Sequence, residues 1–154
     1  MKKILIANPT IGADIECFVR NAQGDIVSAE PYIKGTKHEP FNFDPTDKFF
    51  AVSLDNVLAE FCIPPVNNEN AWLGNINKSL GYVNSLLPEG FCTVSMPSFS
   101  LKDEYLQSDA AKLFGCESDF NAWKRSVNRK PKAENQNLRS AGFHVHVGYE
   151  EPEV

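Results

Sequence analysis

The sequence predicts an α+β domain in which helices cover a mostly antiparallel sheet. Two observations predict this class. Short segments that alternate apolar and polar residues follow one another along the chain, separated by turn residues typical of β-hairpins. One longer segment, residues 67–87, instead carries apolar residues at the three-to-four spacing of an amphipathic helix. A helix of this kind packs its apolar stripe on a sheet.

Composition and charge limit the class of protein. The 154 residues are enough for one domain with a single core, so residues 1–154 are expected to form one unit. Apolar residues make up 42% and charged residues 23%, as in ordinary soluble proteins. The net charge of −5 disfavours a nucleic-acid binder and leaves room for a site that holds divalent cations. Because no apolar run reaches transmembrane length, no membrane partner is expected.

The four cysteines have neither metal-ligand nor redox spacing. We interpret them as reduced, mostly buried thiols of a cytosolic protein. The apolar run at residues 4–6 is too short for the core of a signal peptide. It predicts a short strand.

The first strongly alternating segment, residues 11–19, carries Asp14 and Glu16 on one face. Turn residues follow it, and residues 26–29 can return as the second arm of a hairpin. Residues 31–48 are rich in proline and predict an irregular loop, from which Lys37 could reach a phosphate or carboxylate. A solvated loop without a ligand is the alternative.

The central hairpin and the main helix come next. Residues 49–54 and 57–63 flank Asp55-Asn56, which predicts a two-residue turn. In the second arm, Glu60 and Leu58 lie on one face, and Val57, Ala59, Phe61 and Ile63 lie on the other. Asn67 or Asn68 can cap the helix, and Pro88 stops it.

The last part of the chain ends in a strand with two histidines. Residues 91–96 predict a strand, residues 101–114 a second helix, and residues 124–139 a basic loop that includes Arg139. This loop forms a solvated face or, beside an acidic metal site, gathers a polyphosphate. In the strand within residues 141–148, His144 and His146 share one face. They are either the polar side of a patterned strand or a pair of ligands.

Three strands therefore present polar groups within apolar surroundings: Asp14 with Glu16, Glu60, and the two histidines. Buried charge is costly unless it is paired or bound to a metal. We expect the three strands to converge on one sheet face. Carboxylates suit Mg²⁺ and Mn²⁺, and imidazole widens the choice toward Zn²⁺, so the pattern predicts a divalent-metal site.

Five segments in order also resemble one known family. They are residues 12–18, 35–40, 55–65, 115–123 and 141–148. The chain resembles, from about residue 11 to residue 148, the phage-encoded COOH–NH2 ligases, or type 2 amidoligases. This family is part of the superfamily of glutamine synthetase and glutamate–cysteine ligase.

The resemblance implies a fold, a reaction and roles for residues. The fold is part of a curved half-barrel like that of glutamine synthetase, with two or more helices on its outer face. ATP and Mg²⁺ (or Mn²⁺) bind on the concave side, and a carboxylate is activated as an acyl phosphate that an amine attacks. The implied metal ligands are Asp14, Glu16 and Glu60. The implied nucleotide or cofactor contacts are Lys37, Arg139, His144 and His146. No residue is assigned as catalytic.

Members of the family continue beyond the His-x-His strand, so the resemblance covers their N-terminal half. A domain without the C-terminal half is expected to form a homo-oligomer or to bind a complementing C-terminal chain, which would complete the site. The expected substrates are a small-molecule or peptide carboxylate and an amine, and the expected location is the cytoplasm, that of the host if a phage encodes the chain. The alternatives are an inactive amidoligase-like domain used for binding or assembly, and a metal-dependent hydrolase.

Overall fold

The longest strand, β1 (Ala7–Arg20), organises the fold because four other strands pair with it. The structure, a computed structural model, describes residues 7–112, 120–121, 123–129 and 135–150. It is α+β with a mostly antiparallel sheet, as the alternating segments predict. The strand predicted for residues 4–6 lies outside the described residues.

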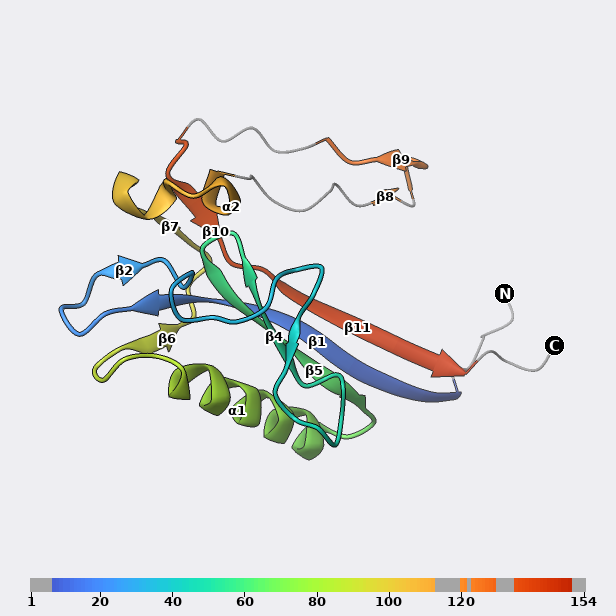
Figure 1. Cartoon of the computed structure of the whole chain (residues 1–154). Helices are drawn as coiled ribbons and strands as arrows, with labels where there is room; N and C mark the ends of the chain where they lie inside the picture. The colour runs from blue at the N-terminus through green and yellow to red at the C-terminus, as the bar shows by residue number, and fades with distance from the viewer. Residues whose placement is uncertain (1–6, 113–119, 122, 130–134, 151–154) are drawn as a thin grey trace.

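The main sheet has seven strands, and every pair in it is antiparallel. The strands besides β1 are β2 (Ile26–Val27), β3 (Phe41–Asn42), β4 (Ala51–Asp55), β5 (Leu58–Val66), β6 (Cys92–Val94) and β11 (Phe143–Glu150). The order is β11-β1-β5-β4-β3, with β2 and β6 on the C-terminal end of β1 (Figure 1). The described sheet is open, with β11 and β3 at its ends. The half-barrel therefore stays a prediction.

Helix α1 (Glu69–Ser85) covers one face of this sheet (Figure 1). The side chain of Asn68 caps it by accepting a hydrogen bond from the Ala71 N–H at 2.9 Å. Val83 is fully buried, and the other residues of the predicted apolar stripe pack against the same core. They are Trp72, Ile76, Leu80 and Leu87. The prediction of a helix that packs on a sheet is confirmed.

A second apolar cluster lies on the opposite face, where Phe18 and Leu58 pack with Leu101, Leu106 and Ala111. The last three residues belong to a short segment that contains the 3₁₀ helix η1 (Asp103–Leu106) and α2 (Asp109–Lys112). The prediction of two helices on one outer face is wrong, because these turns and α1 cover opposite faces.

The prediction of one helix over residues 101–114 is also wrong in its described part. The hydroxyl oxygen of Ser108 accepts a hydrogen bond from the Ala111 N–H at 3.1 Å. A serine that binds backbone in this way favours the start of a new turn over the continuation of an existing one. Residues 113–114 lie outside the described residues.

Strands also replace part of the predicted basic loop. Ser126–Val127 forms β9 and pairs with β8 (Phe120–Asn121), and Leu138–Ser140 forms β10 and pairs with β7 (Ser98–Ser100). Figure 1 shows the β8–β9 hairpin standing away from the main sheet. The segment is therefore a projecting hairpin followed by a strand.

The turn between β4 and β5 differs from the prediction by one residue. Asp55 pairs with Leu58, so the turn consists of Asn56 and Val57. Asn56 has a φ of 61°, a left-handed conformation that asparagine tolerates. As a result Asp55 is the last residue of β4, and its side chain lies on the same face as those of Ser53 and Glu60.

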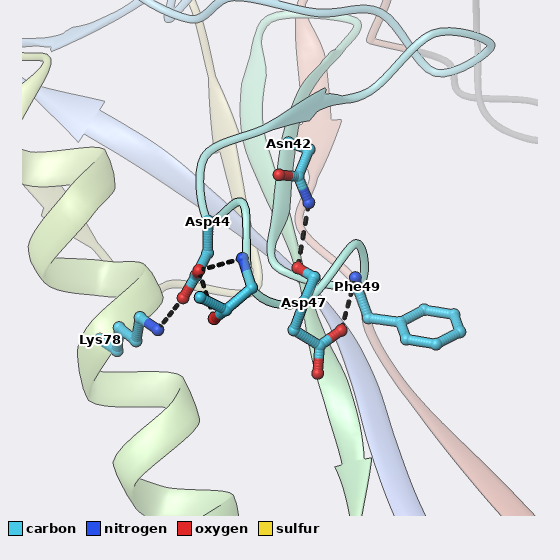
Figure 2. A network of polar contacts seen from close by, with 6 residues as sticks. Asn42, Asp44, Asp47, Phe49 and Lys78 are labelled. Atoms are coloured by element: carbon cyan, nitrogen blue, oxygen red, sulfur yellow. Dashed lines mark hydrogen bonds and ion pairs between the residues drawn. The ribbon is translucent and has the colours of Figure 1, made fainter.

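The loop between β3 and β4 is fastened to α1 through Asp44, as Figure 2 shows. Asp44 forms an ion pair with Lys78 of α1 and also accepts hydrogen bonds from the backbone and hydroxyl of Thr46. The Lys78 ammonium lies 3.9 Å from the centre of the Phe50 ring. The Lys78 side chain thus bridges a charge and an aromatic face, and holds the entry to β4 in place.

Gly35 joins the irregular loop to the sheet. Its carbonyl accepts a hydrogen bond from the Leu54 N–H at 3.2 Å, and its φ is 85°. A Cβ at this position would lie 2.5 Å from the Phe41 nitrogen. Only glycine allows both this conformation and this approach, and the approach brings Lys37 to the end of β4.

Cys17, Cys62 and Cys92 are free thiols, and Cys116 lies outside the described residues. Cys17 is buried and the other two are half-buried, in keeping with the interpretation of the cysteines. No helix among the described residues has the length and apolar character needed to cross a membrane.

Candidate metal centre

Three strands bring the predicted polar residues to one face of the sheet. Asp14 pairs with His144 of β11, and Glu16 pairs with Glu60 of β5. Residues that pair in an antiparallel ladder point to the same face. His146, two positions from His144, shares this face, so the expected convergence of the three strands is present.

Three carboxylates form a close cluster on this face. Oxygen atoms of Glu16, Asp55 and Glu60 all lie within 4.8 Å of one another, and all three residues are half-buried. Two of the three are predicted ligands. Asp55 is the third, and the sequence interpretation missed it because it assigned Asp55 to the turn.

Each carboxylate of this acidic cluster has its own neighbouring donor. The Gly142 N–H donates to Glu16 Oε2 at 2.6 Å, and the Ser53 hydroxyl donates to Glu60 Oε2 at 3.1 Å. Lys37 Nζ lies 3.5 Å from Asp55 Oδ2. These donors orient the carboxylates, as the outer partners of metal ligands do.

The environment disfavours the charged form of two members. Burial raises the pKa of Glu16, and the charge of Asp55 adds to this while the Gly142 N–H opposes it. Burial and the charge of Asp55 likewise raise the pKa of Glu60, against the hydrogen bond from Ser53. Like charges at close range have this effect, and a cation bound between them would reverse it.

Asp14 lies apart from the acidic cluster and faces two other groups. His146 Nε2 lies 2.7 Å from Asp14 Oδ2. Burial, with a hydrogen bond to Asp14, raises the pKa of the Cys62 thiol to about 12. This thiol is therefore protonated at neutral pH and is no nucleophile. The structure pairs Asp14 with His146 instead of placing it among the three clustered carboxylates.

A cavity of about 250 Å³ opens beside the acidic cluster. Glu16, Asp55, His144 and Arg139 all line it. His144 is exposed, so its ring is accessible to a ligand that enters the cavity. Three predicted site residues, Glu16, His144 and Arg139, thus share one cavity with Asp55.

Arg139 is 6% exposed, and its guanidinium is engaged by protein oxygens. Nε donates to Asn56 Oδ1 at 3.0 Å, and Nη2 donates to the Ala111 carbonyl at 2.5 Å. Nη1 donates to the carbonyls of Gln136 and Leu138. These bonds tie β10 to α2 and to the β4–β5 turn. In this arrangement Arg139 supports the cavity wall. Some of its hydrogen bonds would have to break before it could bind a nucleotide phosphate.

Lys37 is the most accessible cation found near the acidic cluster among the described residues, with 45% of its side chain exposed. It lies on the rim of a second hollow, which shares Asp55 and Asn56 with the main cavity. The chain therefore offers a carboxylate cluster with one ammonium beside it. Such a site suits a divalent cation together with an anionic ligand.

Two supporting groups, Ser53 and the Gly142 N–H, were not identified from the sequence. Ser53 and Asp55 lie two positions apart in β4 and therefore share a face. The period of two that identified the other polar residues could thus have identified Ser53 and Asp55 as well. The Gly142 amide carries no residue-type signal, because any residue other than proline has such a group. A Cβ on Gly142 would lie 3.4 Å from Glu16 Oε1, so a glycine lets the strand approach this carboxylate closely.

Comparisons with protein-family models, with curated proteins and with solved structures found no match to this chain.

Proposed function

We propose that this chain is an ATP- and metal-dependent carboxylate–amine ligase domain. The proposed reaction transfers the terminal phosphoryl group of ATP to a carboxylate, giving ADP and an acyl phosphate. An amine then attacks the acyl carbon, and an amide and inorganic phosphate leave. The observation that carries the proposal is the cluster formed by Glu16, Asp55 and Glu60. Two of its members, Glu16 and Asp55, line a cavity together with His144.

The donor set of the acidic cluster fits Mg²⁺ or Mn²⁺. Carboxylate oxygens are the ligands that both ions prefer, and the three groups come from three adjacent strands of the sheet. A bound divalent cation supplies neutralisation of the polyphosphate charge. Ser53 and the Gly142 N–H keep Glu60 and Glu16 in place when the cation is absent.

The nucleotide side of the site rests on fewer groups. Lys37 is the nearest accessible ammonium, and it would contact a phosphate or the substrate carboxylate. His144 would contact the nucleotide from the β11 side of the cavity. His146 would hold Asp14 on the same strand pair, and Arg139 would support the wall instead of binding phosphate.

The finer architecture follows the same resemblance. The open sheet would be part of a half-barrel, and residues 1–154 would belong to an amidoligase-like domain. A homo-oligomer or a complementing chain would supply further cations to the site. The free thiols accord with a cytoplasmic location.

A second candidate is an inactive amidoligase-like domain that binds or assembles. The engagement of Arg139 by protein oxygens favours it, because phosphoryl transfer needs cationic groups around the leaving phosphate. This domain would retain the metal site and lose turnover.

Calorimetric titration with Mg²⁺, Mn²⁺ and then Mg-ATP tests both candidates. The ligase requires metal binding, Mg-ATP binding and release of ADP that depends on a carboxylate and on an amine, with hydroxylamine as a general amine that traps acyl phosphates as hydroxamates. Metal binding without ADP release supports the inactive domain. Phosphate release that does not depend on an amine indicates a hydrolase. A chain that binds neither metal nor nucleotide refutes the ligase proposal for this polypeptide.

A further inference from the structure

The β8–β9 hairpin exposes an unusual amount of apolar surface. Trp123 is 95% exposed, and Phe120 and Val127 are each 64% exposed. None of these side chains is packed against the core of the sheet, and the hairpin stands away from it (Figure 1). A free tryptophan at the tip of a projecting hairpin is costly in water unless a partner covers it.

The side chain of Asn121 makes two hydrogen bonds within the hairpin. Asn121 Oδ1 accepts a hydrogen bond from the Lys124 N–H at 2.9 Å, and the Asn121 amide donates to Asn128 Oδ1 at 3.1 Å. Arg125 has a φ of 52°, which turns the chain back into β9. Hydrogen bonds already formed within the hairpin reduce the conformational entropy that it loses on docking.

The charge of the hairpin opposes that of the rest of the chain. Residues 120–129 contain Lys124, Arg125 and Arg129 and no carboxylate, within a chain of net charge −5. The remainder of the chain is therefore more acidic than the whole. Cations at the tip flank the exposed tryptophan.

An apolar pocket of complementary character lies on the far side of the acidic face, where α1 begins. It has a volume of about 380 Å³ and is lined by Pro9, Ile11, Val66, Trp72, Val145 and, at its polar rim, Asn67, Asn68 and Glu69. Its lining includes no residue of the chain's own hairpin. Ile11 is 42% and Val145 49% exposed, so the apolar floor is open to a partner.

We propose that the hairpin of one copy docks in this pocket of a second copy, with Trp123 inserted in the pocket and Lys124 or Arg125 facing Glu69 at its rim. The aromatic ring meets aliphatic and aromatic side chains, and the cations meet a carboxylate. Tryptophan and arginine are among the residues enriched at the energetic centre of interfaces. If the exchange is reciprocal, two identical contacts close a two-fold dimer.

The charge of the chain favours a second copy over nucleic acid as the partner of the hairpin. Aromatic and basic side chains together also suit single-stranded nucleic acid, because bases stack on aromatic rings. However, the acidic remainder of the chain repels a polyanion and attracts the hairpin of another copy. The part of the chain outside the hairpin also contains the apolar pocket that would receive the tryptophan.

Sedimentation equilibrium of the full chain, from micromolar to millimolar concentration, measures the association. We expect a dimer that dissociates on dilution and weakens in high salt, with a blue shift of the tryptophan fluorescence as it forms. Trp123→Ala should raise the dissociation constant about 30-fold, as loss of a hot spot does. The matched control Phe49→Ala removes an exposed aromatic ring outside both surfaces and should leave the constant unchanged. Lys124→Glu with Arg125→Glu should weaken the dimer, and Lys34→Glu with Lys48→Glu should have a smaller effect.

Mixing two variants gives a decisive test. Trp123→Ala keeps an intact pocket, and Val145→Lys keeps an intact hairpin while it disrupts the pocket. A dimer of either variant alone has no contact between an intact hairpin and an intact pocket. A mixture of the two variants allows one such contact and should associate.

A wild-type chain that is monomeric at all concentrations overturns the proposal. So does a Trp123→Ala dimer as tight as the wild type, or a mixture that stays monomeric. Tighter binding to a single-stranded oligonucleotide or to anionic vesicles than to a second copy would assign the hairpin to that partner instead.

Discussion

Glu16 on β1 lies directly opposite Glu60 on β5, so two carboxylates share one position of an antiparallel ladder. Like charges at such a position destabilise a sheet. Asp55 at the end of β4 brings a third carboxylate to the same place. A cation bound at the proposed metal site would relieve this repulsion.

The identity of the clustered carboxylates predicts which substitutions weaken metal binding. Asp55→Asn and Glu60→Gln should each reduce Mn²⁺ affinity by about tenfold or more, since each removes a charged ligand. Asp14→Asn should have a smaller effect because Asp14 faces His146. Titration of the three variants measures this order. A large loss in Asp14→Asn with no loss in Asp55→Asn would place the metal elsewhere on the face.

The hydrogen bond from Ser53 to Glu60 predicts an indirect effect on the same binding. Ser53→Ala removes the donor that orients Glu60, and Mn²⁺ affinity should fall about tenfold. Ser126→Ala, at an exposed position of the β8–β9 hairpin, is the matched control. Circular dichroism checks that both variants fold. Equal affinities in the two variants would mean that Ser53 does not orient a ligand.

The raised pKa values of Glu16 and Glu60 predict how stability depends on pH. Above the ordinary value of 4.5, the folded state retains protons that the unfolded chain has lost. The free energy of unfolding of the metal-free chain should therefore fall as pH rises through this window. Urea unfolding from about pH 5 to about pH 8 measures the slope. Glu60→Gln should flatten it, and a saturating concentration of Mg²⁺ should stabilise the chain most at the higher pH.

The ion pair between Asp44 and Lys78 predicts the opposite dependence at lower pH. The hydrogen bond from Lys78 lowers the pKa of Asp44 from 3.8 to about 2. This carboxylate contributes stability above its unfolded value, and the contribution is lost as pH falls toward about 2. Asp44→Asn should lower the urea midpoint at neutral pH and match the wild type in acid. Asp109→Asn, whose carboxylate is fully exposed, should change neither.

Two glycines with positive φ predict different costs of substitution. Gly24→Ala meets no atom within 4 Å, so only its φ of 93° is strained, at about 1 kcal/mol. Gly35→Ala adds a Cβ 2.5 Å from the Phe41 nitrogen and 2.8 Å from the Val52 carbonyl oxygen. Its cost should be roughly 3 kcal/mol or more, because backbone must move. Urea unfolding compares the two. Similar urea midpoints for the two variants would mean that the loop around Gly35 can shift to accept the added Cβ.

Much of the face that holds the candidate site could be predicted from alternation alone. Asp14, Glu16, Glu60, His144 and His146 each sit among apolar neighbours, and the period of two assigns them to the same side of paired strands. Asp55 was missed because a turn boundary moved by one residue, and in a strand one residue reverses the face.

Other features depend on tertiary contacts that local sequence does not encode. Arginine is normally exposed, and the burial of Arg139 depends on oxygen acceptors that two distant segments present to it, at Asn56 and Ala111. The split of the predicted second helix depends on a hydrogen bond of the Ser108 hydroxyl, which competes with helix propensity. The projecting hairpin arises in a basic stretch with few strand-forming residues.

The pairing of Asp14 with His144 has a consequence for folding kinetics. These partners lie far apart in sequence, and loop closure must precede the contacts that reward it. During synthesis, β5 leaves the ribosome well before β11 does. The pairing that brings His144 to the cavity should therefore form late, and the rate at which a refolding chain gains affinity for the proposed metal would report the docking of β11.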